Sequence, residues 1–203
     1  MGRVLKTTSG SGGASGGGVS TADVNTLIQA NSEYEYINTL EITSNVTGIT
    51  VSDGIDNQVY EGYKILFTEL KPTTQIYYSH RIYNTSGSVL NFIYLSHTHN
   101  TSYNYSSGNG ASTMYLYGSN SGLSTTSTLH FEIEIMNTGR LANNPIQGYT
   151  KSGLAYPAGY WRHSTRGSFI CSAESHEFGS LEFNNSVSAG QVNLYGRRIR
   201  TQS

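Results

Sequence analysis

Hydrophobic and polar residues alternate along much of the chain after residue 34, which is the period of a half-buried β-strand. The clearest cases are 33–42 (EYEYINTLEI), 75–83 (QIYYSHRIY) and 129–136 (LHFEIEIM). His80 and Ile82 fall on the same face of the second of these. Residues 59–70 (VYEGYKILFTEL) form the strongest apolar run. This run predicts a strand in the centre of a sheet.

Turn residues separate further short strands at regular intervals. Extended segments are predicted at 43–51, 89–95, 113–117, 148–156, 160–171, 181–183 and 191–198. The Asn-, Ser- and Tyr-rich stretch 97–110 is interpreted as a long polar loop. Nine or ten strands without a helix between them are typical of an all-β fold. The predicted architecture is therefore a jelly-roll-like β-sandwich over residues 34–203.

The first 33 residues read as a separate anchoring arm. Residues 9–18 form a flexible Gly/Ser linker, and residues 20–31 predict a short amphipathic helix. A three-turn helix is marginal alone in water, so its apolar face needs a partner surface. Before the linker, the chain predicts a short strand that pairs with another chain. The residues expected to dock on a partner are Val4, Leu5, Val24, Leu27 and Ile28.

Composition narrows the class of partner. Only 12% of the residues are charged and the net charge is −1, so nothing favours binding to nucleic acid or to an anionic membrane. No apolar stretch reaches the roughly 18 residues that a membrane helix needs, and no secretory signal is recognised. The single cysteine, Cys171, follows an apolar run and predicts a buried thiol rather than a disulfide. The 16 tyrosines suit a surface that contacts other proteins.

His97 and His99 form the one pair with metal-ligand character. At strand spacing both imidazoles point the same way, and three chains on a threefold axis would bring six such ligands together. The simpler interpretation is a pair of solvent-exposed loop histidines.

Tyr103, Tyr105 and Trp161 are candidate ligand-binding residues. Their flat rings, set among Asn and Ser, could stack on sugar rings. The alternative is that they pack against neighbouring loops or subunits.

No pattern for catalysis is recognised, and we expect no catalytic residue and no cofactor. Glu132 and Glu134 alternate on one face of a predicted strand, which is typical of the solvated side of a sheet rather than of a glycosidase pair. Asp53 and Asp56 offer too few ligands for a calcium loop.

Two segments resemble virion proteins of cyanophages and other marine tailed phages. The run 60–74 (YEGYKILFTELKPTT) is similar to their Tyr-X-X-Tyr strand and turn, and IYYSHRI (76–82) to the strand that follows. The segment 190–198 (GQVNLYGRR) resembles their closing strand, which ends in Leu-Tyr-Gly.

This resemblance implies a non-enzymatic structural protein of the virion with a jelly-roll-like fold, often trimeric. The expected partners are other virion proteins, with further copies of the chain in a homo-oligomer. The sequence shows no fibre stalk, which favours a capsid decoration protein. A tail fibre or tail appendage that meets a host-surface glycan, a carbohydrate-binding module, and a sugar-active enzyme of jelly-roll type remain alternatives.

Overall fold

The computed structural model describes residues 33–74, 79–99, 103–115, 128–140, 144–155, 163–171 and 176–199. These residues belong to one compact unit, Glu33–Ser203. All regular secondary structure in them is β. Residues 1–32 of the predicted anchoring arm, with its helix and all five of its docking residues, lie outside the described residues.

Twelve strands are found in the described part of the chain. Their bounds are β1 Glu35–Ile42, β2 Ile49–Val51, β3 Tyr60–Pro72, β4 Ser79–Asn84, β5 Phe92–His99, β6 Tyr103–Ala111, β7 Met114–Tyr115, β8 Thr128–Asn137, β9 Gln147–Ala155, β10 His163–Cys171, β11 Phe178–Phe183 and β12 Val187–Arg198.

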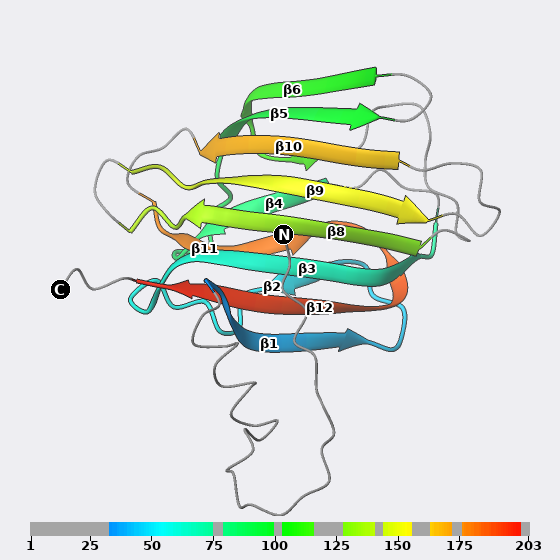
Figure 1. The fold of residues 1–203 in the computed structure, drawn as a ribbon, viewed down its shortest axis with the longest axis horizontal. Coiled ribbons are helices and arrows are strands. Elements are labelled where there is room, and N and C mark those ends of the chain that lie inside the picture. Colours follow the sequence, from blue (N-terminus) through cyan, green and yellow to red (C-terminus); the bar gives the residue numbers. More distant parts are fainter. Residues whose placement is uncertain are drawn as a thin grey trace, which may run out of the picture. The chain divides into compact units, whose positions relative to one another are not determined.

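The strands form one large and one small sheet (Figure 1). The large sheet has eight strands in the order β1-β12-β3-β8-β9-β10-β5-β6, and the small sheet has four in the order β2-β11-β4-β7. Every neighbouring pair is antiparallel. β3 pairs with β12 on one side and β8 on the other, so the apolar run at 59–70 is an interior strand of the sheet, as predicted.

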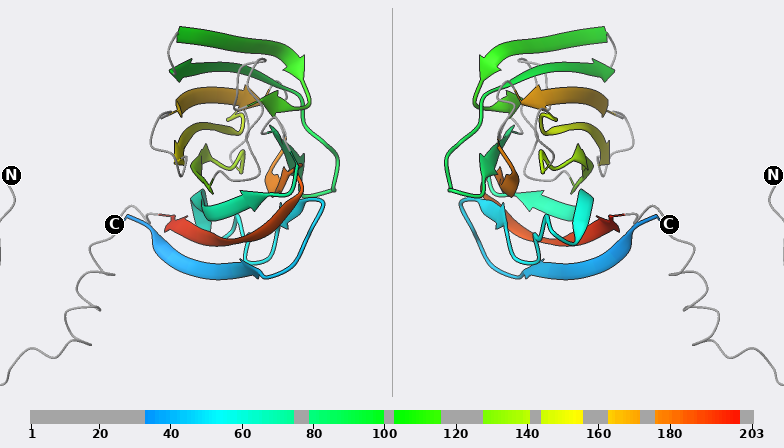
Figure 2. Two further views of the ribbon diagram at one scale, coloured as in Figure 1. Left: turned by 90° about the vertical axis from the view of Figure 1, so that its right-hand side faces the viewer. Right: turned by 90° about the vertical axis from the view of Figure 1, so that its left-hand side faces the viewer.

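The two sheets pack as a sandwich, with the small sheet against one face of the large one (Figure 2). The chain passes repeatedly from one sheet to the other, because β2, β4, β7 and β11 of the small sheet are each flanked in sequence by strands of the large sheet. This confirms the all-β, jelly-roll-like class that the alternation predicted.

Aromatic side chains join the two layers. Phe67 and Phe131, opposite each other on β3 and β8, stack with ring centroids 4.0 Å apart. Phe183 from β11 of the small sheet lies 5.2 Å from the Phe131 ring and 5.7 Å from the Phe67 ring. All three side chains are buried. Burial of large rings supplies the apolar contact that holds the sheets together.

The titratable side chains of this core include His80 and Cys171. His80 on β4 is fully buried, and neither ring nitrogen has a hydrogen-bond partner among the residues that the structure describes. Burial lowers its pKa to about 3, so the imidazole is neutral at pH 7. Cys171 is also buried, as predicted, and burial raises its pKa to about 12. Its thiol is therefore unreactive at neutral pH.

The interpretation of residues 97–110 as a loop was wrong. β5 continues to His99, and β6 returns beside it over Tyr103–Ala111. The Asn, Ser and Gly residues of this stretch are poor strand formers by themselves. Pairing with β5 decides the conformation, because it gives the backbone a ladder of hydrogen bonds that local preference does not supply.

Candidate functional site

Three consecutive residues at the start of the described domain are each fastened to the large sheet. Glu33 forms an ion pair with Arg197 on β12, with Oε1 3.1 Å from Nη1. Tyr34 donates a hydrogen bond from its hydroxyl to Glu134 Oε1 on β8, at 2.6 Å. Glu35 accepts a bond of 2.6 Å from Arg198 Nε. We call this group the entry clamp. It consists of Glu33, Tyr34, Glu35, Glu134, Arg197, Arg198 and Tyr60, whose hydroxyl also bonds to Glu35.

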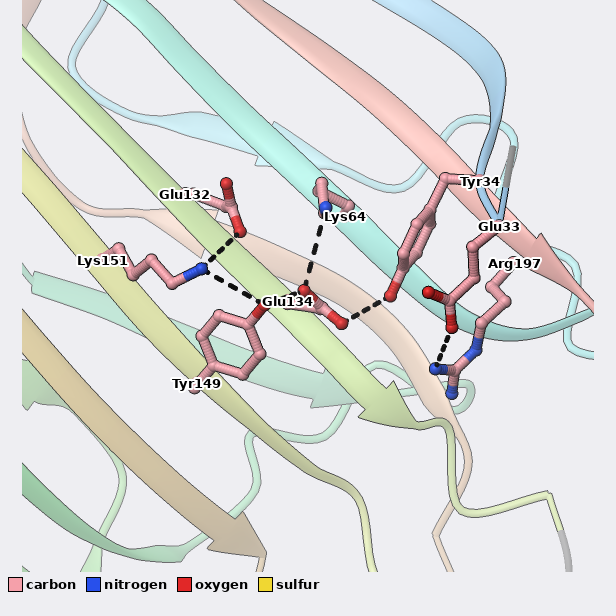
Figure 3. Close-up of polar contacts among 8 residues, drawn as sticks. All are labelled: Glu33, Tyr34, Lys64, Glu132, Glu134, Tyr149, Lys151 and Arg197. Atoms are coloured by element: carbon pink, nitrogen blue, oxygen red, sulfur yellow. Dashed lines mark hydrogen bonds and ion pairs between the residues drawn. The ribbon is translucent and has the colours of Figure 1, made fainter. Parts of the chain in front are cut away.

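Glu134 is the centre of the clamp (Figure 3). It is 8% exposed although it stands on the outer face of the large sheet. Its Oε1 accepts the Tyr34 hydroxyl, and its Oε2 accepts the Tyr149 hydroxyl from the neighbouring strand β9. Lys64 Nζ on β3 lies 3.9 Å from Oε2 and 4.5 Å from the centre of the Tyr34 ring. The carboxylate is thus enclosed by two phenols and one ammonium group.

Burial and these partners have opposite effects on the pKa of Glu134. Burial disfavours the charged form and by itself would raise the pKa. Hydrogen bonds from Tyr149 and Tyr34, together with the positive charge of Lys64, outweigh it, so the pKa lies below its usual value of 4.5. Burial and the bond to Glu134 in turn raise the pKa of both tyrosines. At neutral pH the carboxylate is charged and both phenols keep their protons.

Glu35, on β1, has a similar set of partners, a phenol and a cationic side chain. Glu35 Oε1 accepts the Tyr60 hydroxyl at 2.6 Å, while its Oε2 accepts Arg198 Nε. The bonds from Arg198 and Tyr60 lower the pKa of Glu35. Burial and the bond to Glu35 raise the pKa of Tyr60 to about 12. These contacts fix the first residue of β1 to both β12 and β3.

Chemically, the clamp is suited to holding rather than to reacting. A general acid or base needs a carboxyl group with a pKa near the working pH. Glu134 and Glu35 are both stabilised in the charged form and occupied by donors from their own chain. The clamp therefore joins residues 33–35 to β3, β8 and β12.

The interpretation of Glu132 and Glu134 as one solvated face was half right. Glu132 forms a rim ion pair with Lys151, with Oε1 3.5 Å from Nζ, and its side chain is 24% exposed. Glu134, two residues along, lies beneath Tyr34 and Tyr149. Alternation predicts which face of a strand a residue occupies, but not which side chains from distant segments cover it. Tyr34 and Arg197 likewise carried no local signal as clamp residues.

Replacing Glu134 by Gln is expected to lower the free energy of unfolding by about 1–3 kcal/mol at pH 7, because two phenols and Lys64 lose a charged partner. The contribution of Glu134 is present above the unfolded pKa of 4.5 and is lost as the pH falls through its lower folded pKa. Urea unfolding at pH 7 and pH 3 measures both effects. Glu132→Gln is the matched control and should cost less than about 1 kcal/mol, as a rim ion pair does. Equal losses in the two variants would contradict the assignment.

Four of the predicted site residues are brought together by the backbone. In the β5–β6 hairpin, His97 pairs with Tyr105 and His99 pairs with Tyr103. On the other side of β5, His97 is opposite Arg166 of β10. The residues predicted for a metal site and those predicted for sugar binding, which the sequence treated as separate, therefore occupy adjoining positions on two strands. Trp161 lies outside the described residues.

A polar hollow of about 540 Å³ opens near the other end of β1. Glu41 and Glu69, from β1 and β3, both line it, together with His130 of β8. Glu69 sits at a register shift of β3 with φ 55°, an unusual conformation for a residue with a side chain. Its amide donates a hydrogen bond to His130 Nδ1 at 3.4 Å.

The aspartates of the turn after β2 bond within their own chain. Asp53 Oδ2 accepts a hydrogen bond from Asn38, and Asp56 Oδ1 accepts one from the Gln58 amide. Within the described ranges, no three His, Cys, Asp or Glu side chains gather closely enough to hold a metal ion. The same ranges contain no helix of the length and apolar character that crossing a membrane requires.

Comparison of the chain with protein-family models, with curated proteins and with solved structures found no match.

Proposed function

We propose that this chain is a non-enzymatic structural protein of a tailed-phage virion, most specifically a capsid decoration protein docked by its N-terminal arm. The observation that carries the proposal is the placement of the two segments that resemble marine-phage virion proteins. Residues 60–74 and 190–198 lie far apart in the sequence. In the fold they provide β3 and β12, which pair with each other from Tyr60↔Arg198 to Pro72↔Val187.

The contacts between the two segments explain their characteristic residues. The Tyr60 ring lies over Gly196, where a Cβ would be 2.3 Å from Tyr60 Cδ1, so any other residue in the Leu-Tyr-Gly motif would force this ring to move. Tyr63, the second tyrosine of the Tyr-X-X-Tyr pair, is buried with its ring 5.7 Å from that of Tyr60. The two motifs thus form one packed unit of the large sheet.

The entry clamp supports the role of the arm. A domain held to a particle through a flexible linker needs a firm attachment where the linker meets the fold. Glu33, Tyr34 and Glu35 provide it through ion pairs and charge-assisted hydrogen bonds to interior strands. A protein docked in this way has a structural role, and it functions as many copies bound to one particle.

The test is to locate the chain in particles. We expect its peptides in the mass spectrum of phage particles purified from the source culture, and gold-labelled antibody against the domain to mark the heads. Full-length protein with Val4 and Leu5 changed to Asp should fail to bind particles stripped of it, whereas Thr7→Asp should bind. Absence of the chain from the particles would overturn the proposal. Label on the tails would instead favour a tail fibre or tail appendage.

A carbohydrate-binding role is the second candidate, and the β5–β6 hairpin favours it. Its register places Tyr103 and Tyr105 opposite His99 and His97 on one pair of strands. Sugar-binding sites commonly combine an aromatic ring, which stacks on the sugar, with neighbouring polar groups. A glycan array separates the two roles, since sugar binding by the native chain that is lost in a Tyr103→Ala, Tyr105→Ala double variant would support this one.

A further inference from the structure

The four sheet edges in the described part of the chain differ in how they are protected. β2 and β7, at the edges of the small sheet, are only three and two residues long. β1, at one edge of the large sheet, carries Glu35 and Glu41 and has a register shift between Tyr36 and Asn38. Short strands, charges and bulges are the usual means by which proteins prevent an edge from pairing with another chain.

β6, at the opposite edge of the large sheet, lacks most of this protection. It is nine residues long, and its sequence YNYSSGNGA contains neither a charged residue nor a proline. Its ladder with β5 runs without a shift from Tyr103 to Gly108. Among the described residues only β5 pairs with it, and Figure 1 shows it as the outermost strand. One irregularity, near Gly110 with φ 68°, lies at its far end.

We propose that β6 is a self-association edge, at which a second copy of this chain pairs antiparallel with the first about a twofold axis. Two identical antiparallel strands are self-complementary, because each offers the same row of amide donors and carbonyl acceptors to the other. Every existing pair in the sheet is antiparallel, so the new pair continues the same sheet across the axis.

Charge favours this partner over the other edge. Pairing of β6 with β1 of another copy would bring Glu35 and Glu41, and the bulge of β1, against the ladder, and it would build open-ended chains. Pairing of β6 with β6 introduces no charge from either strand and closes both edges at once. The net charge of −1 adds little repulsion between copies. This inference goes beyond the virion proposal and does not depend on it.

The test is the solution mass of the full chain by light scattering over a range of concentrations. We expect a mass of twice 22.1 kDa, and slower hydrogen exchange at β6 amides when the dimer forms. Ser107 is exposed on β6, so Ser107→Lys should fold normally and weaken the dimer about tenfold or more through like charge. Thr50→Lys, exposed on β2, is the control and should leave the mass unchanged.

Mixing provides a second readout that misfolding cannot imitate. Ser107→Lys and Ser107→Glu should each be mostly monomeric, and an equal mixture of the two should regain the dimer. A monomer at the highest concentration reached, a trimer, or a dimer insensitive to Ser107→Lys would overturn the proposal. Loss of particle binding with an intact dimer would count against the virion role alone.

Discussion

Lowering the pH from 7 to 4 is expected to remove about 3 kcal/mol of folding stability through His80 alone. In the unfolded chain the imidazole takes up a proton near pH 6.5, whereas in the core it stays neutral down to a pKa of about 3. Between these values the unfolded state binds more protons, so stability falls by about 1.4 kcal/mol for each pH unit. The loss reaches about 4 kcal/mol at pH 3, a large part of the stability of an ordinary domain.

The variant His80→Leu isolates this effect. Leucine has a volume similar to that of histidine, and it removes the two ring nitrogens that find no partner among the described residues. At pH 7 the free energy of unfolding of the variant should therefore equal that of the native chain or exceed it by up to about 1.5 kcal/mol. At pH 4 it should exceed the native chain by about 3 kcal/mol. Urea unfolding at several pH values measures both. Ile82→Val, at a buried position two residues along the strand, should cost about 1 kcal/mol at every pH. An imidazole signal of His80 that titrates near pH 6 in the folded protein would refute the argument.

Truncation of Phe183 to Ala is expected to cost about 3–5 kcal/mol at pH 7. Phe183 is the ring from the small sheet that meets Phe67 and Phe131 of the large sheet, and it is completely buried. Its removal leaves a cavity between the layers that neither sheet can close without moving. The midpoint of guanidinium unfolding provides the measurement.

Phe183→Leu is the matched control, because it keeps most of the apolar volume and should cost about 1–1.5 kcal/mol. If Phe183→Ala lost less than about 1 kcal/mol, the ring would not connect the layers, and the sandwich packing at β11 would be wrong. If Phe183→Ala destabilised the protein at pH 7 but not at low pH, the effect would be assigned instead to His80 on the neighbouring strand β4.

Much of the fold could be predicted from the sequence because the core strands alternate strictly. Phe131, Ile133 and Ile135 are buried in β8 at the positions that the pattern of 129–136 indicates. The β5–β6 hairpin could not be found in this way, since residues 97–110 lack apolar alternation apart from Tyr103 and Tyr105 and are rich in Asn, Ser and Gly, which disfavour strands. There the conformation comes from pairing with a strand rather than from the segment itself.

The entry clamp was beyond sequence reasoning for a different reason. Tyr34 and Glu134 are 100 residues apart, and their contact depends on β12 and β3 lying between β1 and β8. Neither residue differs locally from the other tyrosines and glutamates of the chain. The pairing of β3 with β12, by contrast, gives a physical meaning to motifs that the sequence could quote but not connect.

The position of β12 also constrains how the molecule is made. This strand is the last of the twelve along the chain, yet it lies between β1, the first, and β3. Until β12 has left the ribosome, β1 has no neighbour in the large sheet and β3 lacks one of its two, although some 150 residues of the domain are already present. Closing so long a loop is entropically costly and slow. The large sheet therefore cannot be completed until the last strand is made, and the nascent chain must remain soluble with an open sheet until this strand is inserted between two earlier ones.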